Sequence, residues 1–172
     1  MLMSKPLTFQ EAIAQSSEWI GLWDAEELSD DVLADYVGDL VRHRDGARGF
    51  FVASLTGDSP LMDRLPESLV LKLREAGREV VDLTARNLAM STAMTVQHRR
   101  TNELELLSGS EKVQSRSKEL LRQLDPQLVK AKLESLLMGL DGEGEENKFY
   151  ERWGYDSEQK FEIKQTLLSV AE

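Results

Sequence analysis

The chain has 172 residues, 41% of them hydrophobic and 30% charged, a composition typical of a folded protein rather than a disordered one. Its formal net charge of -10 disfavours nucleic acids and anionic lipids as partners, although a local basic patch could still bind an anion. The absence of cysteine excludes disulfides and thiolate metal sites.

Helix signals begin near the N-terminus. Thr8 and Glu11 have the spacing of a capping box, and Ser29 can cap a second helix. The apolar stripe expected on that second helix consists of Val32, Leu33, Tyr36, Val37, Leu40 and Val41. Residues 43–49 are expected to form a turn. Residues 50–55 are an apolar run that periodicity cannot assign to helix or strand, and we favour a helix because a lone strand would have no partner.

The middle of the chain predicts one long helix. Ser59 followed by Pro60 is typical of a cap with a first-turn proline, and Pro66 opens another helix that Gly77 either ends or bends. Residues 78–100 then form a single helix that is apolar or small around most of its circumference, as expected for the centre of a bundle. Its small residues recur every four positions and would allow close approach of a neighbour: Ala85, Ala89 and Ala93.

The last third of the chain continues the helical pattern. Ser108 with Glu111 again has capping-box spacing, and Asp125 precedes a first-turn proline. An acidic, glycine-rich loop at 141–146 separates these helices from a short aromatic helix, and Asp156 caps the last one. We therefore expect an all-α fold, a single domain over residues 5–172 with about seven or eight helices around the helix at 78–100.

The long helix carries a polar stripe that is a candidate ligand site. The stripe consists of Asp82, Arg86, Ala93, Gln97 and Arg100, which recur at helical spacing, and its two arginines could hold a carboxylate or phosphate bidentately. The same stripe could instead be a solvent face, or Asp82 and Arg86 could form a structural ion pair. With the adjoining basic residues, the candidate ligand-binding set is Asp82, Arg86, Gln97, His98, Arg99 and Arg100.

The end of this helix opens the most basic region of the chain. His98, Arg99 and Arg100 are followed by further cations, namely Lys112, Arg116, Lys118 and Arg122. This region could bind an anionic molecule or an acidic protein patch, or its cations could simply stabilise the helix end. His98 could transfer protons in principle, but the sequence offers no obvious group to orient it.

Aromatic residues near the C-terminus allow two interpretations. If Trp153 and Tyr155 are exposed, they are candidate anchors for a partner protein. If they are buried, they fasten the end of the chain to the bundle, an interpretation favoured because large aromatic side chains usually pack.

The sequence contains none of the standard catalytic or phosphate-binding motifs, and it predicts no catalytic set, metal site or cofactor. It also lacks a signal-peptide pattern and an apolar run of the ~20 residues that a membrane helix needs. We therefore expect a cytoplasmic, non-enzymatic protein–protein interaction or regulatory module without a membrane partner, and homo-oligomerisation is compatible with this. The alternative is a binding protein or enzyme for an anionic small molecule that uses Arg86 and Arg100.

Three segments resemble small uncharacterised cyanobacterial proteins. They are residues 87–94, residues 98–100 and residues 151–156. The resemblance covers the C-terminal two-thirds of the chain and implies no activity or site residues.

Overall fold

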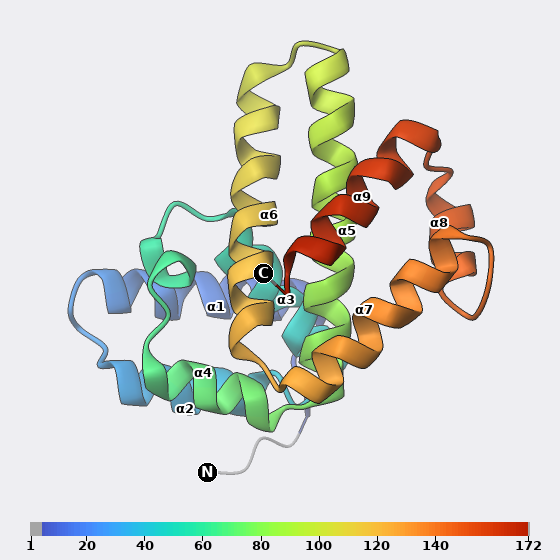
Figure 1. Ribbon diagram of the computed structural model, residues 1–172. Helices are drawn as coiled ribbons and strands as arrows, with labels where there is room; N and C mark the ends of the chain where they lie inside the picture. Colours follow the sequence, from blue (N-terminus) through green and yellow to red (C-terminus); the bar gives the residue numbers. More distant parts are fainter. Residues whose placement is uncertain (1–4, 172) are drawn as a thin grey trace. The chain divides into compact units, whose positions relative to one another are not determined.

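The computed structural model describes residues 5–171, and within them every regular element is helical. The α-helices are α1 (Phe9–Asp24), α2 (Asp30–Leu40), α3 (Arg44–Thr56), α4 (Glu67–Glu75), α5 (Arg78–Arg100), α6 (Leu104–Gln123), α7 (Pro126–Leu140), α8 (Asn147–Trp153) and α9 (Ser157–Ser169). A 3-10 helix, η1 (Pro60–Asp63), precedes α4 (Figure 1). The prediction of an all-α helical bundle is confirmed, with nine α-helices in the described residues rather than seven or eight.

The contacts divide the chain into two compact units, residues 1–83 and residues 84–172. Whether these units make up the single domain expected from the sequence stays a prediction. In the first unit α1 packs on α3, and α2 packs on α4. In the second unit α7 contacts both α8 and α9, and also α6. α5 spans the boundary between the units, and it begins and ends at the predicted residues. Its residues Ala85, Ala89 and Ala93 are fully buried in the second unit.

Close helix packing explains why the expected turn at 43–49 is wrong. α3 begins at Arg44 and includes residues 50–55, so the apolar run is helical as favoured. The glycines that suggested a turn lie inside the helix at close contacts. A Cβ atom on Gly49 would lie 2.4 Å from Cβ of Ala12, and one on Gly46 would lie 2.1 Å from the carbonyl oxygen of Leu40. These glycines are therefore packing residues.

Two further predictions need correction. α6 begins at Leu104, four residues before the expected cap at Ser108, because the chain reverses earlier, where Asn102 has a φ of 58°. On α2, Val32 and Tyr36 are 38% and 43% exposed and do not belong to the core. The remaining four residues of the predicted stripe are buried, namely Leu33, Val37, Leu40 and Val41.

The local start signals are otherwise confirmed. Thr8 and Glu11 form a capping box, and the side chains of Ser29 and Asp125 cap α2 and α7. Gly77, with a φ of 69°, follows the end of α4. Each signal lies within a few residues of the backbone that it satisfies, which is why it can be recognised from sequence alone.

Candidate functional site

A buried carboxylate in the second unit holds two cations together. Nη2 of Arg86 donates to both carboxylate oxygens of Glu146, at 3.2 and 3.3 Å, and Nζ of Lys132 donates to one of them at 2.5 Å. Glu146 is only 6% exposed, so its charge needs partners of opposite sign. Arg86, a predicted ligand-binding residue, already binds a carboxylate of its own chain.

The position of Glu146 follows from the acidic loop and the helix after it. Glu146 is the residue immediately before α8, and its backbone approaches α7 so closely that a Cβ atom on Gly139 would lie 2.8 Å from its carbonyl carbon. The guanidinium of Arg86 also lies 5.5 Å from the ring centroid of Phe149 on α8, within cation–π range. These contacts connect α5, α7 and α8 at one point.

Arg100, the second predicted arginine, forms ionic contacts with the start of α9. It makes a bidentate pair with Asp156, at 2.7 and 3.0 Å, and its Nε and Nη2 donate to Oε1 of Glu158 at 2.9 and 2.6 Å. Asp156 also caps α9 by accepting from the backbone amide of Gln159 at 3.0 Å. The hydrogen bonds from Arg100, and then that backbone bond, lower the pKa of Asp156 to about 2.

The basic region contributes a second contact, at the other end of α9. Arg122 donates to the carbonyl oxygens of Val170 and Ser169 at 3.1 and 2.9 Å, which satisfies acceptors at the end of the helix. Between the two ends, the side-chain amide of Gln159 donates to the carbonyl of Ala93 at 3.1 Å. Arginines of the predicted basic region therefore anchor α9 at both ends.

The other predicted ligand residues have separate environments. In the first unit, Asp82 lies 3.7 Å from Arg44, and its predicted pairing with Arg86 stays a prediction. In the second unit, Gln97 and Arg99 are exposed. His98 does have a partner, since its Nδ1 lies 2.9 Å from Oγ of Ser110.

The spacing of the two arginines limits what they could bind together. Arg86 and Arg100 are fourteen positions apart on α5, which corresponds to about 21 Å along a helix. An anion held by both must therefore be extended, and it must compete with the carboxylates that each guanidinium already binds.

The two aromatic candidates differ in exposure. The ring of Tyr155 lies 6.5 Å from those of Phe149 and Tyr150, and burial raises its pKa to about 12. Trp153 is 49% exposed, with the guanidinium of Arg152 5.8 Å from its ring centroid. Tyr155 therefore packs within the second unit, whereas Trp153 is accessible to a partner.

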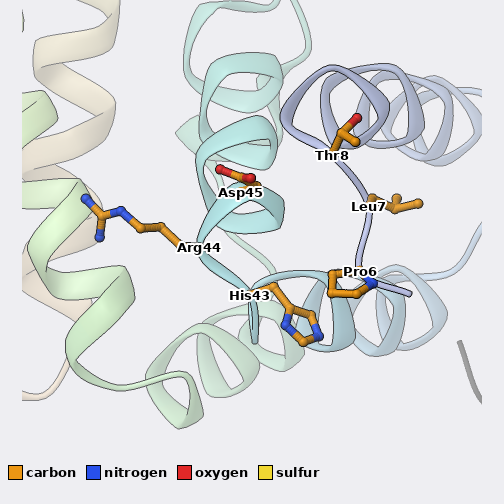
Figure 2. Close-up of a pocket in the computed structure, with 6 residues that line it drawn as sticks. All are labelled: Pro6, Leu7, Thr8, His43, Arg44 and Asp45. Carbon is orange, nitrogen blue, oxygen red and sulfur yellow. The ribbon is translucent and has the colours of Figure 1, made fainter. Parts of the chain in front are cut away.

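A pocket in the first unit is lined by Pro6, Leu7, Thr8, His43, Arg44 and Asp45 (Figure 2). The side chain of Arg44 points away from His43 and Pro6 in this view. It forms ion pairs with Glu79 and Asp82 at the beginning of α5. The one arginine of this pocket is thus directed toward carboxylates of the same unit.

The most unusual distribution of charge lies on α1 and α2 and was missed in the sequence. Residues 6–41 contain no lysine or arginine. They contain nine acidic residues, Glu11, Glu18, Asp24, Glu26, Glu27, Asp30, Asp31, Asp35 and Asp39. This segment accounts for nearly all of the net charge of -10, a signal that charge counting along the chain can detect.

Aromatic side chains connect the same two helices. The rings of Trp19 on α1 and Tyr36 on α2 lie 5.2 Å apart, and Nε1 of Trp23 donates to Asp30 at 2.7 Å. Val32 lies one helical turn before Tyr36, and both are exposed. We call Trp19, Trp23, Val32 and Tyr36, with the acidic residues of α1, α2 and the turn between them, the acidic aromatic surface.

These features describe an all-helical protein with internally paired arginines and an acidic surface. The chain belongs to the family of uncharacterised conserved proteins UCP020893, which matches residues 8–170. No curated protein and no solved structure matches the chain significantly. Among the described residues, no helix combines the length and the apolar character needed to cross a membrane.

Proposed function

We propose that this chain is a non-enzymatic protein–protein interaction or regulatory module. The supporting observation is the acidic aromatic surface, where Tyr36 and Val32 are exposed beside a segment of unbalanced negative charge. Tryptophan and tyrosine are enriched among the residues that dominate binding energy at protein interfaces. A cytoplasmic location is part of the proposal and is consistent with a chain that lacks cysteine.

The second unit supports the same interpretation. Its arginines at 86, 100 and 122 bind groups of the chain itself and hold the helices in place. The alternative function, recognition of an anionic small molecule by Arg86 and Arg100 together, requires that the ligand compete with Glu146 for Arg86 and with Asp156 and Glu158 for Arg100. It is therefore the less supported of the two proposals.

Affinity capture from native lysate tests the proposed function. The tagged full chain should recover a partner protein in a fixed molar ratio after washing at moderate salt. Recovery of no stoichiometric partner would count against an interaction module. Thermal unfolding with phosphorylated metabolites, nucleotides and carboxylates tests the alternative, because a ligand of the folded state raises the unfolding temperature. A shift that disappears in Arg86→Ala would favour it.

A further inference from the structure

We infer that the acidic aromatic surface of α1 and α2 binds a basic, arginine-rich segment of a partner protein. This inference rests on the proposed function and specifies its surface and its partner class. The surface combines aromatic rings that are held in place with an excess of carboxylates. A guanidinium group can stack on such rings and bind such carboxylates.

The rings are positioned before any partner binds. Trp19 lies against Tyr36, with 5.2 Å between the ring centroids, and the indole of Trp23 is fixed by its hydrogen bond to Asp30. These two contacts join α1 to α2. Ordered aromatic side chains lose little conformational freedom on binding, which favours affinity.

The carboxylates near the rings are accessible. Asp35 and Asp39 follow Val32 and Tyr36 by three positions on α2, and their side chains are 69% and 76% exposed. Their cationic neighbours lie at the limit of ion pairing, with Lys72 3.6 Å from Asp35 and Arg42 3.8 Å from Asp39. Exposed pairs of this kind contribute little, so cations of a partner can replace them.

Arginine fits this surface better than lysine. A guanidinium stacks on an aromatic face and binds a carboxylate through a planar pair of donors, whereas an ammonium is a compact, strongly hydrated charge. The chain itself uses this stacking, since Arg48 lies 4.5 Å from the ring centroid of Phe9 and Arg86 lies 5.5 Å from that of Phe149.

Three labelled peptides test the inference with the full chain. One places arginine and leucine at the spacing of an amphipathic helix, the second has lysine for arginine, and the third has glutamate. Fluorescence anisotropy should show the tightest binding for the arginine peptide, weaker binding for the lysine peptide and none for the glutamate peptide. Higher salt should weaken the binding. Equal binding of the arginine and lysine peptides, or no binding of either, would overturn the inference.

Variants locate the peptide on the surface. Tyr36→Ala should weaken binding of the arginine peptide about tenfold, as for a residue that dominates an interface. Asp35→Asn with Asp39→Asn should weaken it and reduce its salt dependence. The controls change an exposed ring and an exposed carboxylate of the second unit, Phe161→Ala and Glu134→Gln, and should leave the affinity unchanged. Circular dichroism of each variant checks that its helices are retained.

Repeating the lysate capture with these variants separates the inference from the proposed function. If the wild-type chain recovers a partner and Tyr36→Ala does not, both are supported. If Tyr36→Ala and the Asp35→Asn, Asp39→Asn variant recover the partner as well as the wild type does, the inferred surface is wrong although the function stands. A self-association that the same variants abolish would identify a second copy as the occupant and overturn the inference.

Discussion

The charged residues of the two units have different environments. In the second unit, Arg86, Arg100 and Arg122 each bind oxygen atoms of the same unit, and these contacts hold α8 and α9 to their neighbours. In the first unit, residues 6–41, which include α1, α2 and the turn between them, contain nine acidic residues and no lysine or arginine, and their rings are partly exposed. Charges that are buried and paired stabilise the fold, whereas carboxylates that are exposed and in excess over the cations near them remain accessible to a partner.

The largest loss of stability is expected at the most buried ion pairs, those of Glu146. Glu146→Gln removes the buried charge that Lys132 and Arg86 both bind and should lower the free energy of unfolding by about 3 kcal/mol. Chemical denaturation measures the change. The control is the neighbouring exposed residue, Glu145→Gln, which should have little effect. Equal effects of the two substitutions would show that the buried cluster does not stabilise the second unit.

The first unit should be most sensitive at its close helix contact. Gly49→Ala places a methyl group 2.4 Å from Cβ of Ala12 and should lower the free energy of unfolding by about 2 kcal/mol. Gly21→Ala, on α1, is the matched control, because its Cβ atom would have no neighbour within 4 Å. Denaturant titration should show that variant to be as stable as the wild type or slightly more so. A Gly49→Ala protein of wild-type stability would contradict the packing described for α1 and α3.

The ion pair between Arg100 and Asp156 at the start of α9 predicts that the stability of the fold decreases in acid. The pKa of Asp156 falls from 3.8 to about 2 because Arg100 and a backbone amide bind its ionised form. The stability from this group is fully present above pH 3.8 and is lost as the pH falls toward 2. Asp156→Asn retains a capping side chain but removes the charge, so its unfolding temperature should fall less over this range. Parallel slopes for the two proteins would argue against the ion pair.

Alkaline pH should report on the aromatic packing of the second unit. Burial raises the pKa of Tyr155 from 10.0 to about 12, so the folded state favours the neutral phenol. Its contribution to stability is present below pH 10.0 and is lost as the pH rises toward 12. Tyr155→Phe cannot ionise and should lose less stability between these values. An unchanged alkaline profile would mean that Tyr155 is not buried as described.

The smallest effect on stability is expected on the acidic aromatic surface. Glu27→Gln with Asp31→Asn removes two exposed charges and should change the free energy of unfolding by no more than ~0.5 kcal/mol. The same change should weaken binding of the arginine peptide because it removes negative charge from the surface. Thermal unfolding and anisotropy measure the two quantities. A large loss of stability would show that these acids support the fold rather than a partner.

Local features of the fold could be predicted, because their cause lies within a few residues. The limits of α5 and the caps at Ser29 and Asp125 are of this kind. The partners of Arg86 and Arg100 could not be predicted, since Glu146 and Asp156 lie 60 and 56 positions away and no periodicity links them. Gly49 suggested a turn for the same reason, because its role depends on contact with Ala12 on α1, far from it in the sequence.

We propose that partners bind the first unit through α1 and α2, while the arginines of the second unit hold its own helices together. Hydrogen exchange of the chain, alone and in complex with its captured partner, tests this most directly. We expect new protection of backbone amides in α1 and α2, with little change around Arg86 and Arg100. Protection confined to the second unit would contradict it.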